Sequence, residues 1–351
     1  MLKNGYWYDL EEFTWRQLRF PTYAPFLGGE YFHPNTIHSL WGKPTIFGNN
    51  NNCDTSGQCE NREIIQYDVD TDNWEVIGMM RNSRTLHDVI EIPDSICDYI
   101  KPLPVEPSEP DNAAVIIGGY RDETGRLAAT VEIFGCDGFE GSQRLDNYPF
   151  GVYLSSSTYY DDKILSCGGF TTGQATSRVT NECYELSPDE GQWLRSVSDL
   201  NNVKQGAIMA LIRDLDESGS VERVPAMLGF DTVTEIYQPD IRRWREYKPL
   251  VEEDWLSFGC LIQHGDKIFS IKDRVMELDT STWKTKQIGE VPFFLRDTGM
   301  CSMAEYQGNE GMSEIYGFLA RSFFLCLAQS FFILSIFFRY FDKTRLFLRP
   351  S

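Results

Sequence analysis

Basic residues and histidine are scarce in this chain of 351 residues. Lysine and arginine together number 32 against 52 aspartates and glutamates, which gives a formal net charge of −20. Because so acidic a surface repels a phosphate backbone, nucleic acid is excluded as the expected partner. The four histidines include no HExxH pair and the cysteines include no CxxC pair. No metal or cofactor site is therefore expected.

The chain also lacks an apolar stretch near its first residue of the kind that a signal peptide needs. Its longest uncharged apolar run, residues 322–338, lies near the other end and is followed by a basic tail. Extended back to residue 317, this run has the length that spans a bilayer, so we expect a transmembrane helix over 317–338. This helix would belong to an apolar C-terminal segment, 318–351. A buried core segment and a stretch translated from a faulty gene model are the alternatives.

What the chain does contain is an internal repeat. A Tyr precedes a Trp at a nearly constant spacing in four places, and a fifth copy has Leu in place of Tyr. Each copy predicts a β-hairpin, because an alternating strand leads through a polar turn into a second strand that opens with Trp. The regular placement of these rings indicates a packing role rather than a binding site. The residues are Tyr8 and Trp15, Tyr67 and Trp74, Tyr184 and Trp193, Tyr237 and Trp244, and Trp283.

Short apolar strands that end in glycine come before most of these hairpins. Two of them end in a glycine pair, Gly118 with Gly119 and Gly168 with Gly169, which permits backbone conformations or close approach that a Cβ would block. With one further apolar strand ahead of each, the unit is four strands long and recurs about every 40 to 70 residues, the periodicity of propeller blades. The predicted fold class is all-β.

This pattern resembles the kelch repeat, in which a glycine pair ends the second strand and a Tyr and a Trp follow at set distances. The resemblance covers residues 5–317 and is fullest around Gly168, Tyr184 and Trp193. It implies a kelch-type β-propeller. The chain opens on the last two strands of a unit and begins a new unit near Asp297. We therefore expect six blades of four strands, with the ring closed by the N- and C-terminal strands.

The resemblance also implies a function. Kelch propellers bind a protein or peptide through loops on one face, so we expect a monomeric, non-enzymatic protein-interaction module, tethered to a membrane if the apolar segment spans one. Aromatic and Arg side chains in those loops mark the expected contact residues, Tyr120, Arg121, Phe170 and Arg178. Two alternatives remain open: the substrate-recognition part of a ubiquitin-ligase adaptor whose N-terminal domain is missing, and a propeller of the copper oxidase type.

The cysteines bear on the compartment. Cys167 directly precedes one glycine pair and Cys183 directly precedes Tyr184, so antiparallel strands would bring them opposite one another as a disulfide. Cys53 and Cys59 can close a small loop in the same way. Disulfides and the basic tail favour a propeller in the secretory pathway or outside the cell, and the absent signal peptide favours the cytoplasm.

Overall fold

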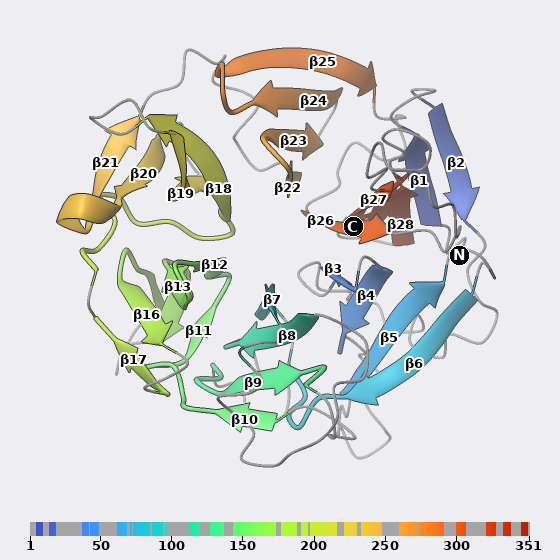
Figure 1. Cartoon of the computed structure of the whole chain (residues 1–351). Helices are drawn as coiled ribbons and strands as arrows, with labels where there is room; N and C mark the ends of the chain where they lie inside the picture. Colours follow the sequence, from blue (N-terminus) through green and yellow to red (C-terminus); the bar gives the residue numbers. More distant parts are fainter. Residues whose placement is uncertain are drawn as a thin grey trace, which may run out of the picture.

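The computed structural model describes residues 5–9, 14–18, 37–41, 43–48, 62–68, 71, 73–84, 86–93, 96, 112–119, 127–136, 143–172, 177–187, 191–195, 197–215, 221–229, 233–247, 260–271, 274–290, 300–306, 321–327, 333–337 and 345–349. Regular structure in these ranges is almost entirely β-strand, apart from the 3₁₀ helix η2 (Pro239–Ile241) and an isolated helical position at Ile96. The strands form many small, mostly antiparallel sheets arranged around a common centre (Figure 1). The expectation of an all-β fold is therefore confirmed, and the many small sheets are consistent with a propeller-like fold.

Five of the sheets share one plan, in which four antiparallel strands follow one another in chain order from the centre outward (Figure 1). Successive hairpins produce this order, because each strand pairs with the one before it. The strands are β3 (Ile37–Leu40), β4 (Lys43–Phe47), β5 (Glu63–Asp68) and β6 (Asn73–Met79); β7 (Asp88–Pro93), β8 (Asn112–Ile117), β9 (Val131–Phe134) and β10 (Gln143–Leu145); β12 (Ser156–Tyr160), β13 (Lys163–Cys167), β16 (Cys183–Ser187) and β17 (Gln192–Leu194); β18 (Ile208–Leu215), β19 (Val221–Leu228), β20 (Thr234–Gln238) and β21 (Arg243–Tyr247); and β22 (Cys260–His264), β23 (Lys267–Ile271), β24 (Arg274–Asp279) and β25 (Lys284–Glu290).

Two of the repeated Tyr and Trp pairs face one another in the outer hairpin of their sheets. Tyr67 is the register partner of Trp74, and their ring centroids lie 5.1 Å apart. Tyr237 and Trp244 are partners in the same way, with centroids 5.3 Å apart. Both tyrosines are buried. In these two hairpins the fixed spacing in the sequence thus corresponds to a cross-strand aromatic contact.

The stretched copy packs differently. Trp193 pairs with Leu186 rather than with Tyr184, and its ring lies 4.9 Å from that of Tyr148, a residue between β10 and β11. Tyr184 also contacts Tyr148, with centroids 5.4 Å apart. The two additional turn residues therefore place Trp193 against the neighbouring sheet instead of against its own Tyr.

Apolar side chains fill the spaces between neighbouring sheets. One buried cluster joins residues of β7, β8 and β9 to residues of β13 and β16, and others lie between the next pairs of sheets. Residues 113–117 of β8 are all fully buried. Because a sheet in this position is covered on both faces, its inner strands are continuously apolar rather than alternating.

A buried carboxylate holds the chain where it enters the β7–β10 sheet. Glu132 of β9 accepts hydrogen bonds from the backbone N–H groups of Arg81 (2.7 Å) and Asn82 (3.2 Å) and forms an ion pair with Arg84. Both side chains of the ion pair are fully buried. Arg84 also donates to the carbonyl oxygens of Gly118 and Thr130. The charges are thus compensated by hydrogen bonds, as burial requires.

Glu235 of β20 does the same for the β18–β21 sheet. It is fully buried and accepts hydrogen bonds from the backbone N–H groups of Asn201 (2.6 Å) and Asn202 (2.9 Å). The nearby Lys204 donates to the carbonyl oxygen of Val233 at 2.7 Å. The two sheets therefore use the same carboxylate position, but Arg84 is bonded to the carboxylate in one sheet and Lys204 is bonded to a backbone carbonyl in the other.

Neighbouring sheets are joined through the backbone just ahead of their innermost strands. The N–H of Leu154 donates to the carbonyl of Leu86 at 3.1 Å, and the N–H of Gly206 donates to the carbonyl of Leu154 at 3.0 Å. Leu86, Leu154 and Gly206 have φ angles of 54°, 55° and 56°. All three are thus left-handed, a conformation that is uncommon for leucine. The same joint therefore recurs at two successive junctions.

Side chains add to these joints between innermost strands. The N–H of Met209 on β18 donates to Ser156 Oγ on β12 at 2.6 Å. The Gln263 amide of β22 accepts from the N–H of Leu211 at 2.8 Å and donates to the carbonyl of Leu211. A side-chain amide thus continues the backbone ladder from one sheet to the next.

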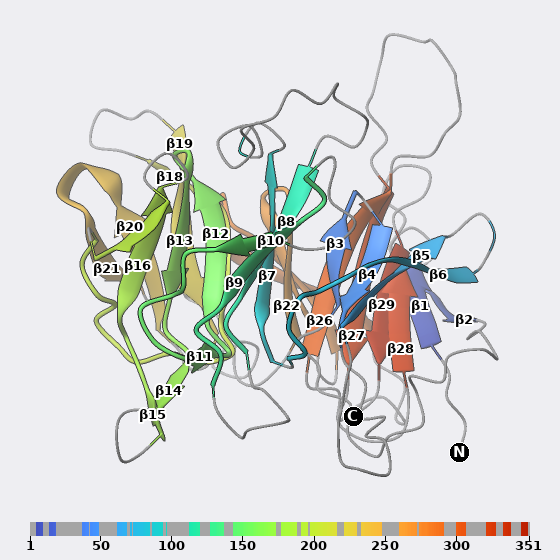
Figure 2. The ribbon, with the colours of Figure 1, turned by 90° about the horizontal axis from the view of Figure 1, so that it is seen from below.

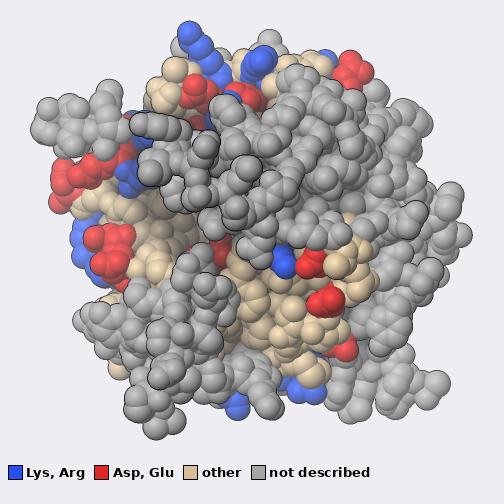
Figure 3. Space-filling view, turned by 45° about the vertical axis from the view of Figure 1, so that its right-hand side comes forward, with Lys and Arg blue, Asp and Glu red and all other residues tan. Residues whose placement is uncertain are grey.

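Exposed ion pairs lie on the outside of the sheets. Figure 3 shows acidic and basic side chains interspersed on the described part of one face. Arg245 pairs with Asp214 at 2.6 Å, and Arg213 and Arg223 both pair with Asp266, at 2.9 and 3.0 Å. Solvent screens such pairs, so each contributes little to stability.

The prediction of an apolar helix over 317–338 is wrong, because the described residues of the C-terminal segment form strands instead. These strands are β27 (Arg321–Leu327), β28 (Ile333–Phe337) and, further on, β29 (Arg345–Arg349). Phe and Ile favour strands, and an apolar run without a period fits a strand as well as a helix. No helix in the described part of the chain has both the length and the apolar character needed to cross a membrane.

These C-terminal strands share one sheet with the N-terminal strands and with β26. β1 (Gly5–Asp9) pairs with β2 (Thr14–Leu18), which places Tyr8 opposite Trp15. β1 also pairs with β29, and β27 pairs with β26 (Met300–Tyr306) and with β29. Strands from the two ends of the sequence therefore lie side by side.

Candidate functional site

Two of the four expected contact residues lie on a small separate sheet. β11 (Val152–Tyr153), β14 (Phe170–Thr172) and β15 (Ser177–Val179) pair in the order β11-β14-β15 and project from one end of the molecule (Figure 2). Phe170 lies on β14 and Arg178 on β15. Tyr120 and Arg121 fall outside the described residues.

A row of partly exposed apolar side chains crosses this sheet. The register pairs Tyr153 with Phe170 and Phe170 with Val179, which puts all three on one face. The rings of Tyr153 and Phe170 are stacked, with centroids 5.0 Å apart and planes 12° apart. Val152 and Thr171, on the opposite face, are buried. We call Tyr153, Phe170 and Val179 the hairpin row.

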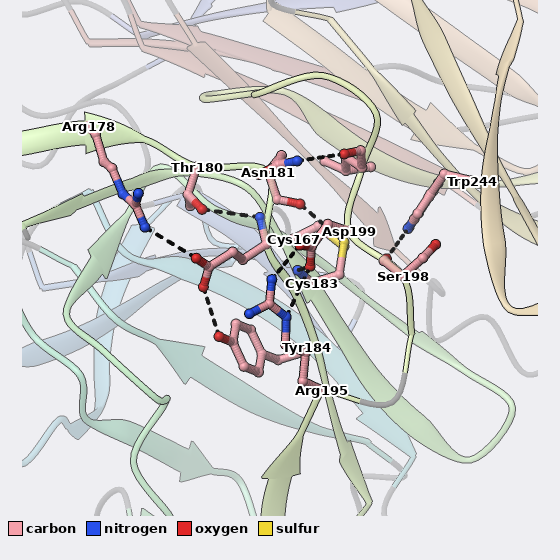
Figure 4. Close-up of polar contacts among 12 residues, drawn as sticks. Cys167, Arg178, Thr180, Asn181, Cys183, Tyr184, Arg195, Ser198, Asp199 and Trp244 are labelled. Atoms are coloured by element: carbon pink, nitrogen blue, oxygen red, sulfur yellow. Dashed lines mark hydrogen bonds and ion pairs between the residues drawn. A yellow bond between two sulfur atoms is a disulfide. The ribbon is translucent and has the colours of Figure 1, made fainter.

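Arg178 points away from the hairpin row, because it is paired with Thr171 on the other face. Its side chain is 65% exposed and forms an ion pair with Glu182 at 3.2 Å. Glu182 in turn accepts a hydrogen bond from the Tyr184 hydroxyl at 2.8 Å (Figure 4). Burial, together with this hydrogen bond, raises the pKa of Tyr184 to about 12. Phe170 and Arg178, the two predicted contact residues that the structure describes, therefore lie on opposite faces of the small sheet.

The glycine pair before β14 fixes the base of the hairpin. Gly168 and Gly169 have φ angles of 70° and 93°. A Cβ on Gly169 would lie 2.8 Å from the Tyr153 carbonyl oxygen and from the Ser155 nitrogen, and one on Gly168 would lie 2.6 Å from the Lys204 carbonyl oxygen. Neither space nor conformation allows a side chain here.

Backbone hydrogen bonds use this close approach. The N–H of Gly169 donates to the carbonyl of Lys204 at 2.7 Å, and the N–H of Thr180 donates to the carbonyl of Gly169 at 2.9 Å. Both ends of the hairpin are therefore tied to the segment that leads into β18. The glycine conformations and these hydrogen bonds therefore fix the backbone at the base of the hairpin row.

The predicted disulfide between Cys167 and Cys183 is confirmed. The two residues are register partners on β13 and β16, their Cα atoms are 4.2 Å apart, and both are fully buried (Figure 4). The bond lies directly before Gly168, so it fixes the strand from which the hairpin departs. Cys136 is disulfide-bonded as well. Cys53 and Cys59 lie outside the described residues.

Asp199 supports the same region from the following loop. Its carboxylate pairs with Arg195 and accepts a hydrogen bond from the Cys183 N–H at 3.4 Å (Figure 4). Asn181 donates from its side chain to the carbonyl of Leu200 at 2.7 Å. The start of the strand that carries Cys183 is thus tied twice to the loop of Asp199 and Leu200.

Sequence reasoning missed Tyr153 and Val179. Residues 151–160 read as one continuous strand, but the chain breaks at Leu154, whose φ of 55° separates β11 from β12. A left-handed leucine leaves no mark in a sequence pattern. Side chains alternate between the two faces of a strand, so the sequence does predict that Val179 lies on the face opposite to Arg178.

The described residues contain no group of three His, Cys, Asp or Glu side chains placed to hold a metal ion. What the site offers instead is a stacked aromatic pair beside an aliphatic side chain on a fixed base. Such an arrangement suits contact with another apolar surface.

Comparison with known proteins assigns neither a family nor an activity to the chain. No family model matches the chain, and no curated protein matches it significantly. Among solved structures, 273 chains match. One is described as the structure of YjhT, with a TM-score of 0.42 and 14% sequence identity, covering 55% of this chain and 68% of that one. A similarity of this size carries no argument about activity.

Proposed function

We propose that the chain is a kelch-type propeller of six blades, closed by its terminal strands. The support is the contacts among the innermost strands, which run from β3 to β7, β12, β18, β22 and β26 and from there back to β3. The five four-stranded sheets would be five blades. The sheet that combines β1 and β2 with β26, β27 and β29 would be the sixth, and its mixed origin removes a free strand edge.

The propeller acts as a non-enzymatic module that binds a protein or peptide. The observation that carries this proposal is the hairpin row, because Tyr153, Phe170 and Val179 leave apolar surface partly exposed on a projecting sheet. Single exposed apolar residues are ordinary, but a row that includes a stacked aromatic pair is typical of an interface. The fixed base lowers the entropy lost when a partner binds.

The test is capture of partners by the immobilised full chain. Wild type, Phe170→Ala and Ile241→Ala are compared, with denatured protein as background. Ile241 is the matched control, because it is 58% exposed but lies in η2 on another sheet. We expect a partner that wild type and Ile241→Ala retain and that Phe170→Ala loses by at least tenfold in affinity.

Folding of each variant is checked by circular dichroism before capture. Equal retention by Phe170→Ala and wild type would remove the hairpin row as the contact surface. Absence of any captured protein, together with turnover of a small molecule, would overturn the proposed function itself.

A further inference from the structure

A group of buried polar side chains lies between the β7–β10 sheet and the β12–β17 sheet. Asp88 begins β7, and its carboxyl lies beside Ser157 of β12. Ser157 is the register partner of Ser166 on β13, so the two hydroxyls share one face. Tyr148 donates its hydroxyl to the Ser166 carbonyl oxygen at 3.5 Å. We call Asp88, Ser155, Ser157, Ser166 and Tyr148 the Asp88 junction.

Several polar atoms of the Asp88 junction have no hydrogen-bond partner within the described part of the chain. They are the hydroxyl oxygens of Ser155 and Ser166, together with Asp88 Oδ2 and Ser157 Oγ, which lie close to one another without the geometry of a full hydrogen bond. The three serines are 6%, 7% and 0% exposed. Native proteins leave very few buried polar atoms unpaired, and those not paired by the protein are paired by ordered water. The atoms of Asp88, Ser157 and Ser166 lie together, because Ser157 contacts Asp88 and is the register partner of Ser166, and they indicate a site for water.

Among the described residues, no cation offsets the charge of Asp88. Burial raises its pKa to about 7, and the Ser157 hydroxyl with the backbone N–H groups of Val89 and Ser157 oppose this rise in part. Tyr148 faces it from the segment before β11, with its own pKa raised by burial. On the same strand end, burial and Arg84 lower the pKa of His87, which leaves that ring neutral. The Asp88 carboxyl therefore changes between its protonated and ionised forms near neutral pH.

The Asp88 junction lies directly behind the hairpin row. Ser155 follows Leu154, whose N–H donates to the carbonyl of Leu86 across the two sheets. The Ser155 nitrogen also lies in the space that glycine leaves open at Gly169. A shift of the two sheets at Asp88 is therefore passed to the base of the hairpin.

We infer that the Asp88 junction is a buried binding site for water and one proton, and that it controls how firmly the hairpin base is held. With the proton bound, the neutral carboxyl needs little hydration and the sheets stay closed. When the proton leaves, the carboxylate recruits water through Ser155, Ser157 and Ser166, and the joint opens more often. The inference does not depend on the proposed partner binding.

The sign follows from linkage. An acid whose pKa is higher in the closed than in the open state loses closed-state stability as pH rises toward the closed-state pKa, and the loss levels off above it. With values of 3.8 and about 7, the opening equilibrium rises about tenfold between pH 6 and pH 8. Below pH 3.8 the effect vanishes, because both states carry the proton.

Hydrogen exchange of the full chain tests this. The amides of Leu154 and Gly169 are followed at pH 6 and pH 8, corrected for intrinsic exchange rates, in wild type, Asp88→Asn and Asp240→Asn. Asp240 is the control because it is exposed, on η2. We expect protection to fall about tenfold in wild type and Asp240→Asn and to stay constant in Asp88→Asn. The same fall in Asp88→Asn would overturn the inference.

A second variant keeps the test valid if Asp88→Asn misfolds. The Ser157 hydroxyl lowers the pKa of Asp88, so Ser157→Ala should move the midpoint of the transition to higher pH. An unchanged or lower midpoint contradicts the assigned role. A crystal structure at pH 8 should show water within hydrogen-bond distance of Asp88 Oδ2, and its absence there would overturn the water site.

Discussion

The ion pair between Arg84 and Glu132 should be energetically coupled, in contrast to the equivalent residues of the β18–β21 sheet. Glu132→Gln leaves the guanidinium of Arg84 buried without its counter-ion, because both side chains are fully buried. Removing one partner of such a pair costs about 3 to 5 kcal/mol. Arg84→Met removes the opposite charge but leaves the Glu132 carboxylate with its backbone donors, so we expect about 3 kcal/mol.

The double variant Arg84→Met/Glu132→Gln should then cost less than the sum of the single variants, by about 2 to 3 kcal/mol. The physical reason is that it leaves no unpaired charge in the interior. Glu235→Gln, Lys204→Met and the corresponding double variant provide the matched cycle. Glu235 receives its hydrogen bonds from Asn201 and Asn202, whereas Lys204 donates to the carbonyl of Val233. These bonds go to different groups, so we expect the coupling in that cycle to be below about 1 kcal/mol, smaller than that of Arg84 and Glu132.

Urea unfolding of all six variants, followed by tryptophan fluorescence and circular dichroism, gives the two coupling energies. Equal slopes with denaturant concentration are the control for unchanged unfolding behaviour. A coupling below about 1 kcal/mol at Arg84 and Glu132 would refute the argument that the pair compensates itself. A coupling of the same size in the Glu235 cycle would show that the shared carboxylate position, rather than the cation, sets the energy.

Three further results are expected. Replacing Cys167 and Cys183 together with Ser should lower the free energy of unfolding by about 3 kcal/mol, since the bond closes a loop with a sequence separation of 16; equal stability under reducing and oxidising conditions would contradict it. Trp193→Ala should cost about 2 to 3 kcal/mol, because its ring is only partly buried although it contacts the neighbouring sheet; an unchanged melting temperature would exclude this packing role. Backbone strain should cost about 1 kcal/mol in both Gly169→Ala and Gly191→Ala. Gly169→Ala should cost at least about 2 kcal/mol more, because of these two glycines only Gly169 has atoms within reach of a Cβ; similar losses in the denaturation midpoints of the two variants would refute the close approach.

The sequence predicts the repeated hairpins well because each one is a local structure. Tyr67 and Trp74 are close in the chain, and the polar turn between them leaves the two strands few ways to pair. The disulfide at Cys167 follows from the same local logic, since both cysteines are placed by landmarks of one unit. The all-β class needs no more than this repetition.

Features that depend on contacts between sheets are not predictable in this way. Residues 322–338 form an apolar run without periodicity, and only the pairing with distant strands makes part of it a strand. Tyr153 enters the hairpin row only because Leu154 is left-handed, and Asp88 becomes unusual only where another sheet covers it. No single-unit pattern contains that information.

The backbone joint through Leu86, Leu154 and Gly206 aligns adjacent units without the help of side chains. A connection between an N–H and a carbonyl places no requirement on residue type beyond tolerance of one conformation, which is why leucine and glycine serve equally. At this joint a unit can therefore change residue type without a matching change in its neighbour, whereas the apolar clusters between sheets require side chains that match. Differences in residue type at this joint therefore leave unchanged the backbone contact that aligns one unit with the next.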